Sequence, residues 1–570
     1  MNKSLAMKNT LDGGEAVLEA CRKLGVEYIV SSPGTEWAPV WEAMANQMQA
    51  GLAGPKFMDV WHETLAVNIA AGYAMATGKM QAVLLHAGSG LLQGAMGIHG
   101  ALLSSVPMVV ISGETMTYGE NVEFDPGAQW VNNLSVVGGT TRMVEPMVKF
   151  STQAGSSHTI YESVIRAGEM AQRSPVGPTY LSVSTETLMD EWSPPNNPRE
   201  VPPAPKLQTA PEDIQKLAGL LAKAKNPVVL TEAGGRDPEG FQALVRLSEL
   251  AAVPVVENRG SLFANFPKVH PMHQGSDFSA FWDDADLVIV ISARAPWYPP
   301  SDCPPNADIA IIDETPHRPF MVYQSLQANL YLEGDIARTL RDLADAVEAI
   351  GLDAASVEAR RARMIAAHDK IQETNRAIQD DARTQSPIDQ IWLTACLNEV
   401  MPDNVIYVDE VTSHTGMLRQ HLDWNQPGSL YSRQGGLGQG LGLSLGVKLG
   451  QPDRPVVTLI GDGAFLYNPV LQALGAARDY DLPTMAVVFN NRKYLAMQGM
   501  HLKMYPDGTA VETDNFHGTH IHGPDLTKVA EAFGAYGEQV EDPEQVQDAL
   551  RRGLEAVNSG KSAIINVVIS

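Results

Sequence analysis

Short apolar runs alternate with longer amphipathic segments along the chain, and this alternation predicts its fold class. Near the carboxyl end, the apolar runs 455–460 and 484–489 flank one helix-sized segment, 468–480. Runs of this length that are bounded by glycine, proline or aspartate are typical of buried strands. Strands that alternate with helices form parallel sheets covered by helices. The sequence therefore predicts an α/β protein built from doubly wound parallel sheets.

The same alternation recurs in three blocks that two linkers separate. A proline-rich stretch over 192–205 favours an extended spacer, and a charged helical stretch over 358–383 ends before Ser386 and Pro387. We therefore expect three domains, over residues 1–190, 206–350 and 385–570. The other expected strands are 28–30, 82–86 and 108–111 in the first block, 227–230, 254–256, 287–291 and 309–312 in the second, and 405–408 and 563–568 in the third.

Composition and charge narrow the class of protein. The chain has 570 residues and a formal net charge of −25, which argues against a nucleic-acid or anionic-membrane partner because both attract basic surfaces. The acidity alone indicates an ordinary soluble surface. Cys21, Cys303 and Cys396 are scattered and have no metal-like spacing, as expected in a reducing compartment. No long apolar stretch follows Met1, so we expect no signal peptide, no membrane span and a cytoplasmic location.

Polar residues with metal-binding chemistry follow two of the predicted strands. Gly461, Asp462 and Gly463 come after the first run, and Asn490 and Asn491 come after the second. In parallel sheets the carboxyl ends of strands border the ligand crevice. A carboxylate and an amide oxygen, with a backbone carbonyl just beyond, can hold Mg²⁺, which in turn can hold a diphosphate. Glycine and aspartate alone are also ordinary turn formers, and the asparagine pair favours the site.

Two further signals concern the loops around this unit. Asn468 and Pro469 have the residue types of a helix N-cap and first helical position. The glycine cluster 435–442 precedes an apolar helix pattern but does not fit GxGxxG, and no GxxxxGK[ST] occurs, so nicotinamide and nucleoside-triphosphate sites are poorly supported. The cluster is either a flexible loop that permits close helix packing or a loop whose backbone meets a cofactor.

These motifs resemble those of thiamine-diphosphate enzymes of the acetolactate-synthase, pyruvate-decarboxylase and benzoylformate-decarboxylase kind. Nearly the whole chain is covered, and the benzoylformate-decarboxylase kind is the most similar. Besides the glycine and asparagine motifs, the resemblance is carried by residues 25–28 with 32–35, by 61–63 with 71–78, and by 85–90, 409–413 and 434–438. It implies a pyrimidine-binding, a central and a diphosphate-binding domain. It also implies a homodimer or homotetramer whose cofactor lies between the first domain of one subunit and the third of another.

The resemblance further implies the cofactors, thiamine diphosphate and Mg²⁺, and the residues that hold them. Asp462, Asn491 and the Lys493 carbonyl would bind the metal, and Leu437 would keep the cofactor bent. The other implied cofactor-binding residues are Glu63, Thr412, Ser413, Gly436, Gly463 and Ala464.

Two positions depart from the family pattern. The family often has serine where this chain has Ala464, so one hydroxyl contact to the diphosphate is lost. Benzoylformate decarboxylase has a second histidine in its central domain, whereas the corresponding stretch 295–298 has none. These differences bear on the substrate and on the path of protons.

Three residues are candidates for catalysis. Glu63 would hydrogen-bond the aminopyrimidine and promote its imino tautomer, although an acid at a helix start is also favoured by the helix dipole. His86 would orient substrate or move protons, or it is a satisfied structural histidine. Thr35 would hydrogen-bond a substrate carboxylate or carbonyl, or it caps its own turn. His414 follows the diphosphate turn and is a weaker candidate to face the reaction centre.

The stretch 500–522 is expected to be a mobile lid, with a plain surface loop as the alternative. It contains His517, His520 and His522, but no cysteine supports a metal site there.

The expected reaction is cleavage of a carbon–carbon bond next to a carbonyl in a small-molecule substrate, in which a 2-oxo acid loses carbon dioxide and an enamine is protonated to an aldehyde. The alternatives are an acetolactate-synthase-like carboligase, an acyl-CoA lyase or hydrolase of the same family, and a non-catalytic protein of this fold. Intact Glu63, Asp462 and Asn491 argue against the last. No nucleotide fingerprint occurs in the central block, so no bound flavin is expected.

Overall fold

The computed structural model describes residues 11–114, 125, 139–258, 260–321 and 323–570. Residues 1–10, where a signal peptide would begin, lie outside these ranges. The described chain forms two compact units. Unit 1 contains residues up to Pro205 with two later segments, Gln434–Gln451 and Pro469–Tyr480, and unit 2 contains Lys206–Arg433, Pro452–Asn468 and Asp481–Ser570.

Three all-parallel sheets confirm the predicted α/β class. The strand order is β2-β1-β3-β4-β6-β5 in the first sheet, β11-β10-β9-β7-β8 in the second and β13-β12-β14-β15-β17-β16 in the third. The first sheet comprises β1 (Tyr28–Ser32), β2 (Lys56–Asp59), β3 (Gln81–Leu85), β4 (Met108–Glu114), β5 (Ser151–Gln153) and β6 (Pro178–Ser184). The second comprises β7 (Pro227–Thr231), β8 (Val255–Glu257), β9 (Leu287–Ile291), β10 (Asp308–Asp313) and β11 (Leu330–Glu333). The third comprises β12 (Ile406–Glu410), β13 (Leu430–Ser432), β14 (Val456–Gly461), β15 (Met485–Asn490), β16 (Tyr536–Val540) and β17 (Ala563–Val568).

Helices cover both faces of the first sheet. One face packs on α1, α2 and α6, where Ile29, Leu84 and Ile111 join a common core. The other face lies against α3 and α4. The helices of unit 1 are α1 (Gly13–Lys23), α2 (Ala38–Gln49), α3 (Glu63–Thr77), α4 (Ser89–Leu103), α5 (Thr140–Val144), α6 (Ser157–Gln172), α7 (Thr185–Met189), α14 (Gly440–Gly450) and α16 (Val470–Asp479), with the short 3-10 helices η1 (Thr35–Trp37) and η4 (Glu145–Met147).

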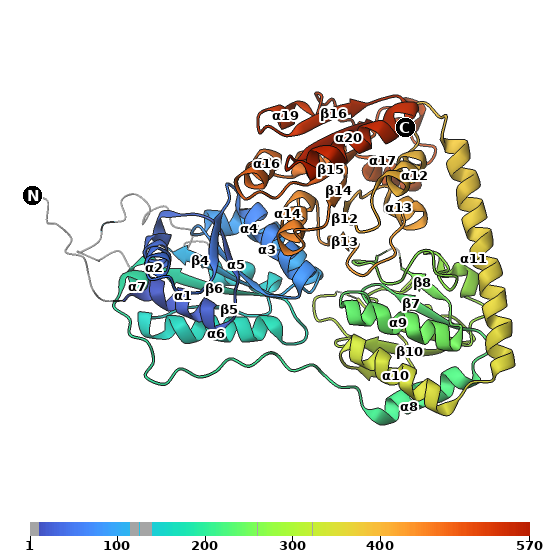
Figure 1. Cartoon of the computed structure of the whole chain (residues 1–570), viewed down its shortest axis with the longest axis horizontal. Coiled ribbons are helices and arrows are strands. Elements are labelled where there is room, and N and C mark those ends of the chain that lie inside the picture. Colours follow the sequence, from blue (N-terminus) through green and yellow to red (C-terminus); the bar gives the residue numbers. More distant parts are fainter. Residues whose placement is uncertain (1–10, 115–124, 126–138, 259, 322) are drawn as a thin grey trace, which may run out of the picture. The chain divides into compact units, whose positions relative to one another are not determined.

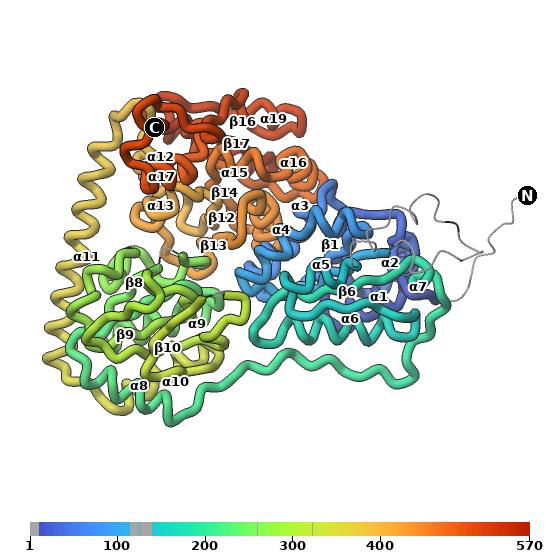
Figure 2. Tube along the Cα trace, turned by 180° about the vertical axis from the view of Figure 1, so that it is seen from behind, coloured from blue at the N-terminus to red at the C-terminus, as the bar shows by residue number. Residues whose placement is uncertain are grey.

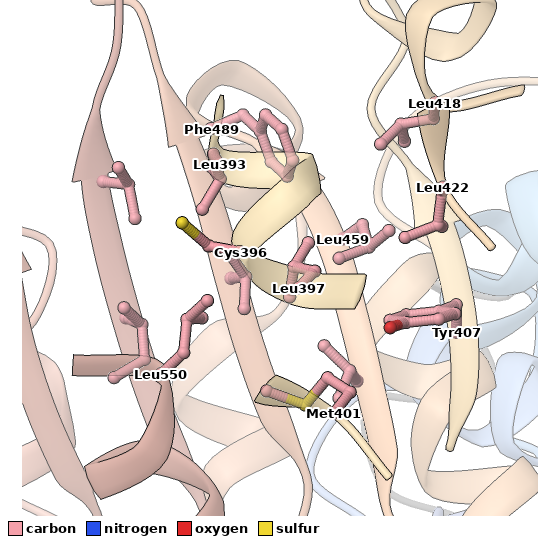
Figure 3. Packing of buried hydrophobic residues seen from close by; sticks show 14 of the residues in the cluster. Leu393, Cys396, Leu397, Met401, Tyr407, Leu418, Leu422, Leu459, Phe489 and Leu550 are labelled. Atoms are coloured by element: carbon pink, nitrogen blue, oxygen red, sulfur yellow. The ribbon is translucent and has the colours of Figure 1, made fainter. Parts of the chain in front are cut away.

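Both faces of the second sheet are buried, which explains its continuous apolar strands. Along β9, Ile289 packs towards α8, α9 and α10, whereas Val288 and Val290 belong to a separate core that includes Phe278 and Trp297. The third sheet buries a large core against α12, α13 and α20, in which Leu397, Leu459 and Phe489 take part (Figure 3). The helices of unit 2 are α8 (Pro211–Lys223), α9 (Pro238–Ala251), α10 (Ile336–Ile350), α11 (Ala354–Ala382), α12 (Gln390–Val400), α13 (Thr415–His421), α15 (Asp462–Tyr467), α17 (Leu495–Met504), α18 (Thr509–Glu512), α19 (Lys528–Glu531) and α20 (Val546–Asn558), with η5 (Phe278–Phe281) and η6 (Pro543–Gln545).

The predicted charged helical stretch is the single long helix α11, which runs along unit 2 between α10 and α12 in both views (Figure 1 and Figure 2). Few of its side chains are buried, but three of them are polar and hydrogen-bonded: Arg360, His368 and Asn375. Arg360 donates to the carbonyl oxygens of Ala251, at 3.1 Å, and of Ala224, at 3.2 Å, and Asn375 donates to the Gln420 carbonyl at 3.3 Å. Hydrogen bonds to α9 and α13, together with the buried Met364 and Ala382, therefore hold this helix to the rest of unit 2.

A helix does begin near the start predicted at Asn468 and Pro469, one residue later than expected, but Asn468 is not its N-cap. A short helix, α15, begins at Asp462, and Asn468 caps its carboxyl end, while α16 begins at Val470. The Asn468 amide donates to the Glu410 carboxylate and to the Ala464 carbonyl, each at 2.8 Å. The Asn468 NH₂ group thus binds a buried carboxylate and the preceding helix, and α16 begins without a side-chain cap.

The stretch expected to be a lid is not a plain loop. It contains the end of α17 and the whole of α18, and Phe516 and Thr519 are buried within it. Its role as a lid stays a prediction. Among the described residues, no helix is both long enough and apolar enough to cross a membrane.

Candidate active site

Glu63 is the first residue of α3, where the chain leaves β2 through an exposed Trp61. The preceding His62 caps the helix, since its Nδ1 accepts from the Thr64 amide at 3.2 Å. The half-buried Glu63 side chain lies against α4 at Gly90, where a Cβ atom would stand 3.2 Å from Glu63 Oε1. The helix start thus holds the carboxylate at the edge of the first sheet, as expected.

The glycine loop that carries Gly436 and Leu437 lies against the same two helices. Gly435, Gly436 and Gly438 all have positive φ, and a Cβ atom at Gly436 would stand 2.7 Å from the sulfur of Met96 on α4. Gln439 donates to the carbonyl oxygens of Gln434, at 2.9 Å, and Gly436, at 3.1 Å, and so fixes the turn. The glycine cluster therefore packs closely beside the Glu63 helix, as the first of its two predicted roles requires. Its contact with a cofactor stays a prediction.

Helices α3 and α14 cross at backbone distance. A Cβ atom at Gly446 would stand 2.7 Å from the Tyr73 amide nitrogen and 2.9 Å from Gly72 Cα. Asn68 of α3 donates to the Gly438 carbonyl at 3.3 Å. Because α14 begins directly after the glycine loop, this crossing fixes the loop relative to Glu63.

His86 follows β3 and is held by an acid that the sequence analysis did not single out. Its Nδ1 lies 2.9 Å from both carboxylate oxygens of Glu36, which is 3 % exposed and also accepts from the Ala87 amide at 2.7 Å. The hydrogen bond from Glu36 raises the pKa of His86, burial opposes this, and the charges of Glu36 and Glu63 add to the increase. Thr35, the residue before Glu36, is exposed.

The Glu36 pair is a consequence of strand register. Ser32 at the end of β1 pairs with Leu85 at the end of β3, so the turns that follow both strands meet. An acid two residues after Gly34, together with a histidine directly after the neighbouring strand, is the sequence signal that could have identified the pair.

In unit 2, Asp462 and Asn491 follow the neighbouring strands β14 and β15, which pair in parallel. Asp462 Oδ1 accepts from the Gly463 amide at 2.8 Å, whereas Oδ2 is buried and has no hydrogen-bond partner in the part of the chain that the structure describes. Burial raises the pKa of Asp462. Nearby backbone N–H groups, including those of Gly463, Arg492 and Lys493, act in the opposite direction and lower it. An unpaired buried carboxylate oxygen is costly unless a cation or a donor satisfies it.

The turn that carries Asn491 is tightly organised. Asn491 Oδ1 accepts from the Lys493 amide at 3.0 Å, and Arg492 between them has a φ of +58°. Asn490 donates to Asn566 on β17 at 3.0 Å, and Asn566 donates in turn to Gln539 on β16 at 3.0 Å. This row of amides ties the turn to the sheet.

A small cavity of about 130 Å³ opens at this edge, and its lining includes Asp462, Asn490, Arg492, Ile521, Leu526 and Gln539. Gly463 makes room for the ring of Tyr494, because a Cβ atom there would stand 2.7 Å from Tyr494 Cδ1. The next residue, Ala464, is buried in α15.

The predicted diphosphate turn links β12 to α13. Thr412 and Ser413 are exposed, and Thr412 Oγ1 accepts from Arg433 at 2.8 Å. His414 is buried, which lowers its pKa, and its Nε2 lies 3.4 Å from Asn491 Nδ2. The structure thus brings the turn and the asparagine motif together through a histidine that the sequence ranked low.

The donor set suits Mg²⁺ and a diphosphate. Asp462 supplies a charged oxygen with an unfilled bonding capacity, Asn491 and the Lys493 carbonyl supply neutral oxygens on the adjoining turn, and hard oxygen donors are what Mg²⁺ prefers. Within the described ranges, no group of three or more His, Cys, Asp and Glu side chains forms a metal site, which includes the histidines of 500–522.

The family models agree with this arrangement. The amino-terminal TPP-binding domain of thiamine pyrophosphate enzymes matches residues 11–135, the central domain of the same enzymes matches 214–343, and their carboxyl-terminal TPP-binding domain matches 410–567.

Relatives and solved structures are similar over almost the whole chain. Acetolactate synthase of Bacillus subtilis is 26 % identical over 95 % of this chain and 91 % of its own length, and benzoylformate decarboxylase of Pseudomonas aeruginosa is 25 % identical over 95 % and 96 %. The structure of benzoylformate decarboxylase from Polynucleobacter necessarius has the same fold, with a TM-score of 0.78, 21 % identity and 98 % of each chain covered. The structure of a 4-hydroxybenzoylformate decarboxylase from Rhodococcus jostii has a TM-score of 0.78 and 24 % identity, over 98 % of this chain and 99 % of its own.

Three family models match in chain order and agree with the placement of Glu63, Asp462 and Asn491. The chain therefore belongs to the family of thiamine pyrophosphate enzymes.

Proposed function

We propose that the protein is a thiamine-diphosphate- and Mg²⁺-dependent lyase that decarboxylates a 2-oxo acid to an aldehyde. The observation that carries the metal and diphosphate site is the buried, unpaired Asp462 Oδ2 at the carboxyl end of β14, next to the Asn491 turn. Asp462, Asn491 and the Lys493 carbonyl would hold the metal, and the exposed hydroxyls of Thr412 and Ser413 would bind the diphosphate. The Ala464 position adds no hydroxyl, so the diphosphate has one contact fewer than with serine there.

When bound, the thiamine group supplies the electron sink for breaking the carbon–carbon bond. The protein's part is to position it and to move protons. Gly436 and Leu437 would support the aminopyrimidine ring, and Glu63 would share a proton with that ring. The absence of a side chain at Gly90 of α4 supports this role, because a Cβ atom there would stand 3.2 Å from the Glu63 carboxylate.

His86 and Thr35 would act on the substrate. Thr35 is exposed and would hydrogen-bond the substrate carboxylate or carbonyl. The raised pKa of His86 favours a protonated imidazole, which attracts an anionic 2-oxo acid and can return a proton to the product. This proton donor favours the lyase outcome.

A carboligase is the second candidate, because acetolactate synthases are among the relatives. Both outcomes use the same cofactor and differ in what the activated fragment meets next. An acyl-CoA lyase or hydrolase remains an alternative with no observation of its own, and the absence of flavin stays a prediction.

We also propose a cytoplasmic homo-oligomer, at least a dimer, whose sites lie at subunit interfaces. Helix α17 supports this, because it is rich in apolar residues but buries none of them, with Met497, Met500 and Met504 all exposed. Light scattering after size exclusion would measure the subunit count, and a monomer would contradict the proposal.

The reaction is tested with a panel of 2-oxo acids, with and without acceptor aldehydes, followed by mass spectrometry of the products. Aldehyde as the sole product supports the lyase, and hydroxyketones or acetohydroxy acids favour the carboligase. In Glu63→Gln, turnover is expected to fall by about 100-fold or more, since a positioned acid–base group contributes about 10²–10⁴. Unchanged turnover in this variant would contradict the assigned role.

A further inference from the structure

The buried acid Glu36 has no role in the function proposed so far, yet it is bound directly to the candidate proton donor. Both its oxygens lie 2.9 Å from His86 Nδ1, and Oε1 also accepts from the Ala87 amide at 2.7 Å. The carboxylate thus binds the His86 ring and the backbone beside it, while the His86 side chain keeps 33 % of its surface exposed.

We propose that Glu36 is a positioning residue, which holds His86 through Nδ1 so that Nε2 is the nitrogen that exchanges protons with the substrate. The two ring nitrogens of histidine are distinct, and the partner of one decides the tautomer and the direction of the other. A carboxylate can only accept, so Nδ1 must carry a proton and donate it. Nε2 is then free to hold a second proton or to release it.

The backbone around the pair is shaped to accommodate it. Gly113 at the end of β4 lies under the carboxylate, since a Cβ atom there would stand 2.8 Å from Glu36 Cδ. A Cβ atom at Gly34 would stand 2.6 Å from Glu36 Oε1 and would also overlap His86 Nδ1. Gly34 in the turn after β1 and Gly113 in β4 therefore make the space that the Glu36–His86 pair fills, and any side chain at either would displace it.

The charges facing His86 come from two elements. Glu36 on η1 makes the hydrogen bond, and Glu63 at the start of α3 adds a second negative charge nearby. Both carboxylates stabilise the protonated ring, and burial acts against them. The pair therefore keeps His86 charged to higher pH than an isolated histidine, next to the residue expected to share a proton with the cofactor.

The test measures the titration of His86 itself and needs no turnover. Diethyl pyrocarbonate modifies only neutral imidazole, so the rate of His86 modification, followed by peptide mass spectrometry across pH, gives its midpoint. In Glu36→Gln, the amide oxygen can still accept from Ala87 and from Nδ1, but the negative charge that stabilises the protonated ring is removed. The midpoint is expected to fall by about one pH unit.

The matched control is Glu114→Gln, because Glu114 is another buried glutamate at this sheet edge that binds Thr140 instead, at 2.7 Å. Its His86 midpoint should equal that of the unsubstituted protein. In the Glu36 variant, kcat with the best 2-oxo acid should fall by about tenfold, with KM within about twofold. An unchanged His86 midpoint in Glu36→Gln would overturn the proposal, even if the variant were less stable.

A second measurement covers the case in which Glu36→Gln does not fold. In the unsubstituted protein, the midpoint of His86 must lie above that of His158, an exposed histidine of the same unit, and an equal or lower value would overturn the proposal. The inference about substrate protons rests on the proposed function. If thiamine diphosphate does not bind at all, that function fails, whereas the titration still decides whether Glu36 controls His86.

Discussion

The crossing of α3 and α14 yields a prediction whose size follows from the structure. In Gly446→Ala, the new Cβ atom would stand 2.7 Å from the Tyr73 amide nitrogen, and it would also overlap the Ile69 carbonyl oxygen. Ordinary contact begins at 3.4 Å, so the helices must separate by at least 0.7 Å (3.4 − 2.7). Both neighbours are backbone atoms of a helix and cannot turn aside, so the whole helix must move.

Overpacking of this kind costs about 1–3 kcal/mol, which exceeds the gain of up to about 1 kcal/mol that alanine normally gives over glycine in a helix. The thermal midpoint, measured by differential scanning fluorimetry, should fall by about 2–8 °C. Because α3 carries Glu63 and α14 follows the glycine loop, a shift approaching 1 Å should also lower turnover, by about 10- to 100-fold.

The control is Gly219→Ala in α8, where nothing lies within 4 Å of the new Cβ atom. This variant should be as stable as the unsubstituted protein or slightly more stable. If Gly446→Ala melts at the same temperature as Gly219→Ala, the helices do not meet at backbone distance and the reasoning is refuted.

Two further predictions concern unit 2. Burial lowers the pKa of Lys268 to about 8. The charged side chain therefore destabilises the folded state below about pH 8, and this destabilisation is lost as pH rises from about 8 towards 10.5. The free energy of unfolding of Lys268→Met, minus that of the unsubstituted protein, should therefore be more favourable at pH 7 than at pH 10.5 by on the order of 3 kcal/mol. A difference that does not change with pH in chemical denaturation would contradict this. Asn566→Val leaves the amides of Asn490 and Gln539 without their partner, so it should cost about 2–4 kcal/mol and weaken Mg²⁺ binding. An unchanged melting temperature and metal affinity would show that the amide row does not support the turn.

The central strands were predictable because both their faces are buried. Residues 287–291 and 484–489 are continuous apolar runs, and β9 and β15 occupy the interior of their sheets. Edge strands lack this signal. β2 and β16 have exposed or half-exposed residues at most positions, so their sequences do not differ from those of loops.

Local signals at Asn468 predicted a helix start to within one residue but assigned the asparagine the wrong role, since it ends α15. Asparagine followed by proline is a typical helix start, but here the Glu410 carboxylate at the end of β12 takes the asparagine amide. The Glu36–His86 contact also depends on the fold. Its two residues are 50 positions apart and meet only because β1 and β3 are neighbours in parallel register. Motifs with fixed spacing identified Asp462 and Asn491, whereas contacts that depend on register did not appear in the sequence.

The central claim is that Asp462 anchors thiamine diphosphate through a divalent cation, and calorimetric titration of the cofactor into metal-free protein tests it directly. The account predicts heat of binding only when Mg²⁺ is present, and a loss of about 100-fold or more in affinity in Asp462→Ala, while Asp403→Ala, an exposed aspartate of the same unit, binds normally. Binding that is equally tight without Mg²⁺, or that survives in Asp462→Ala, would contradict the account.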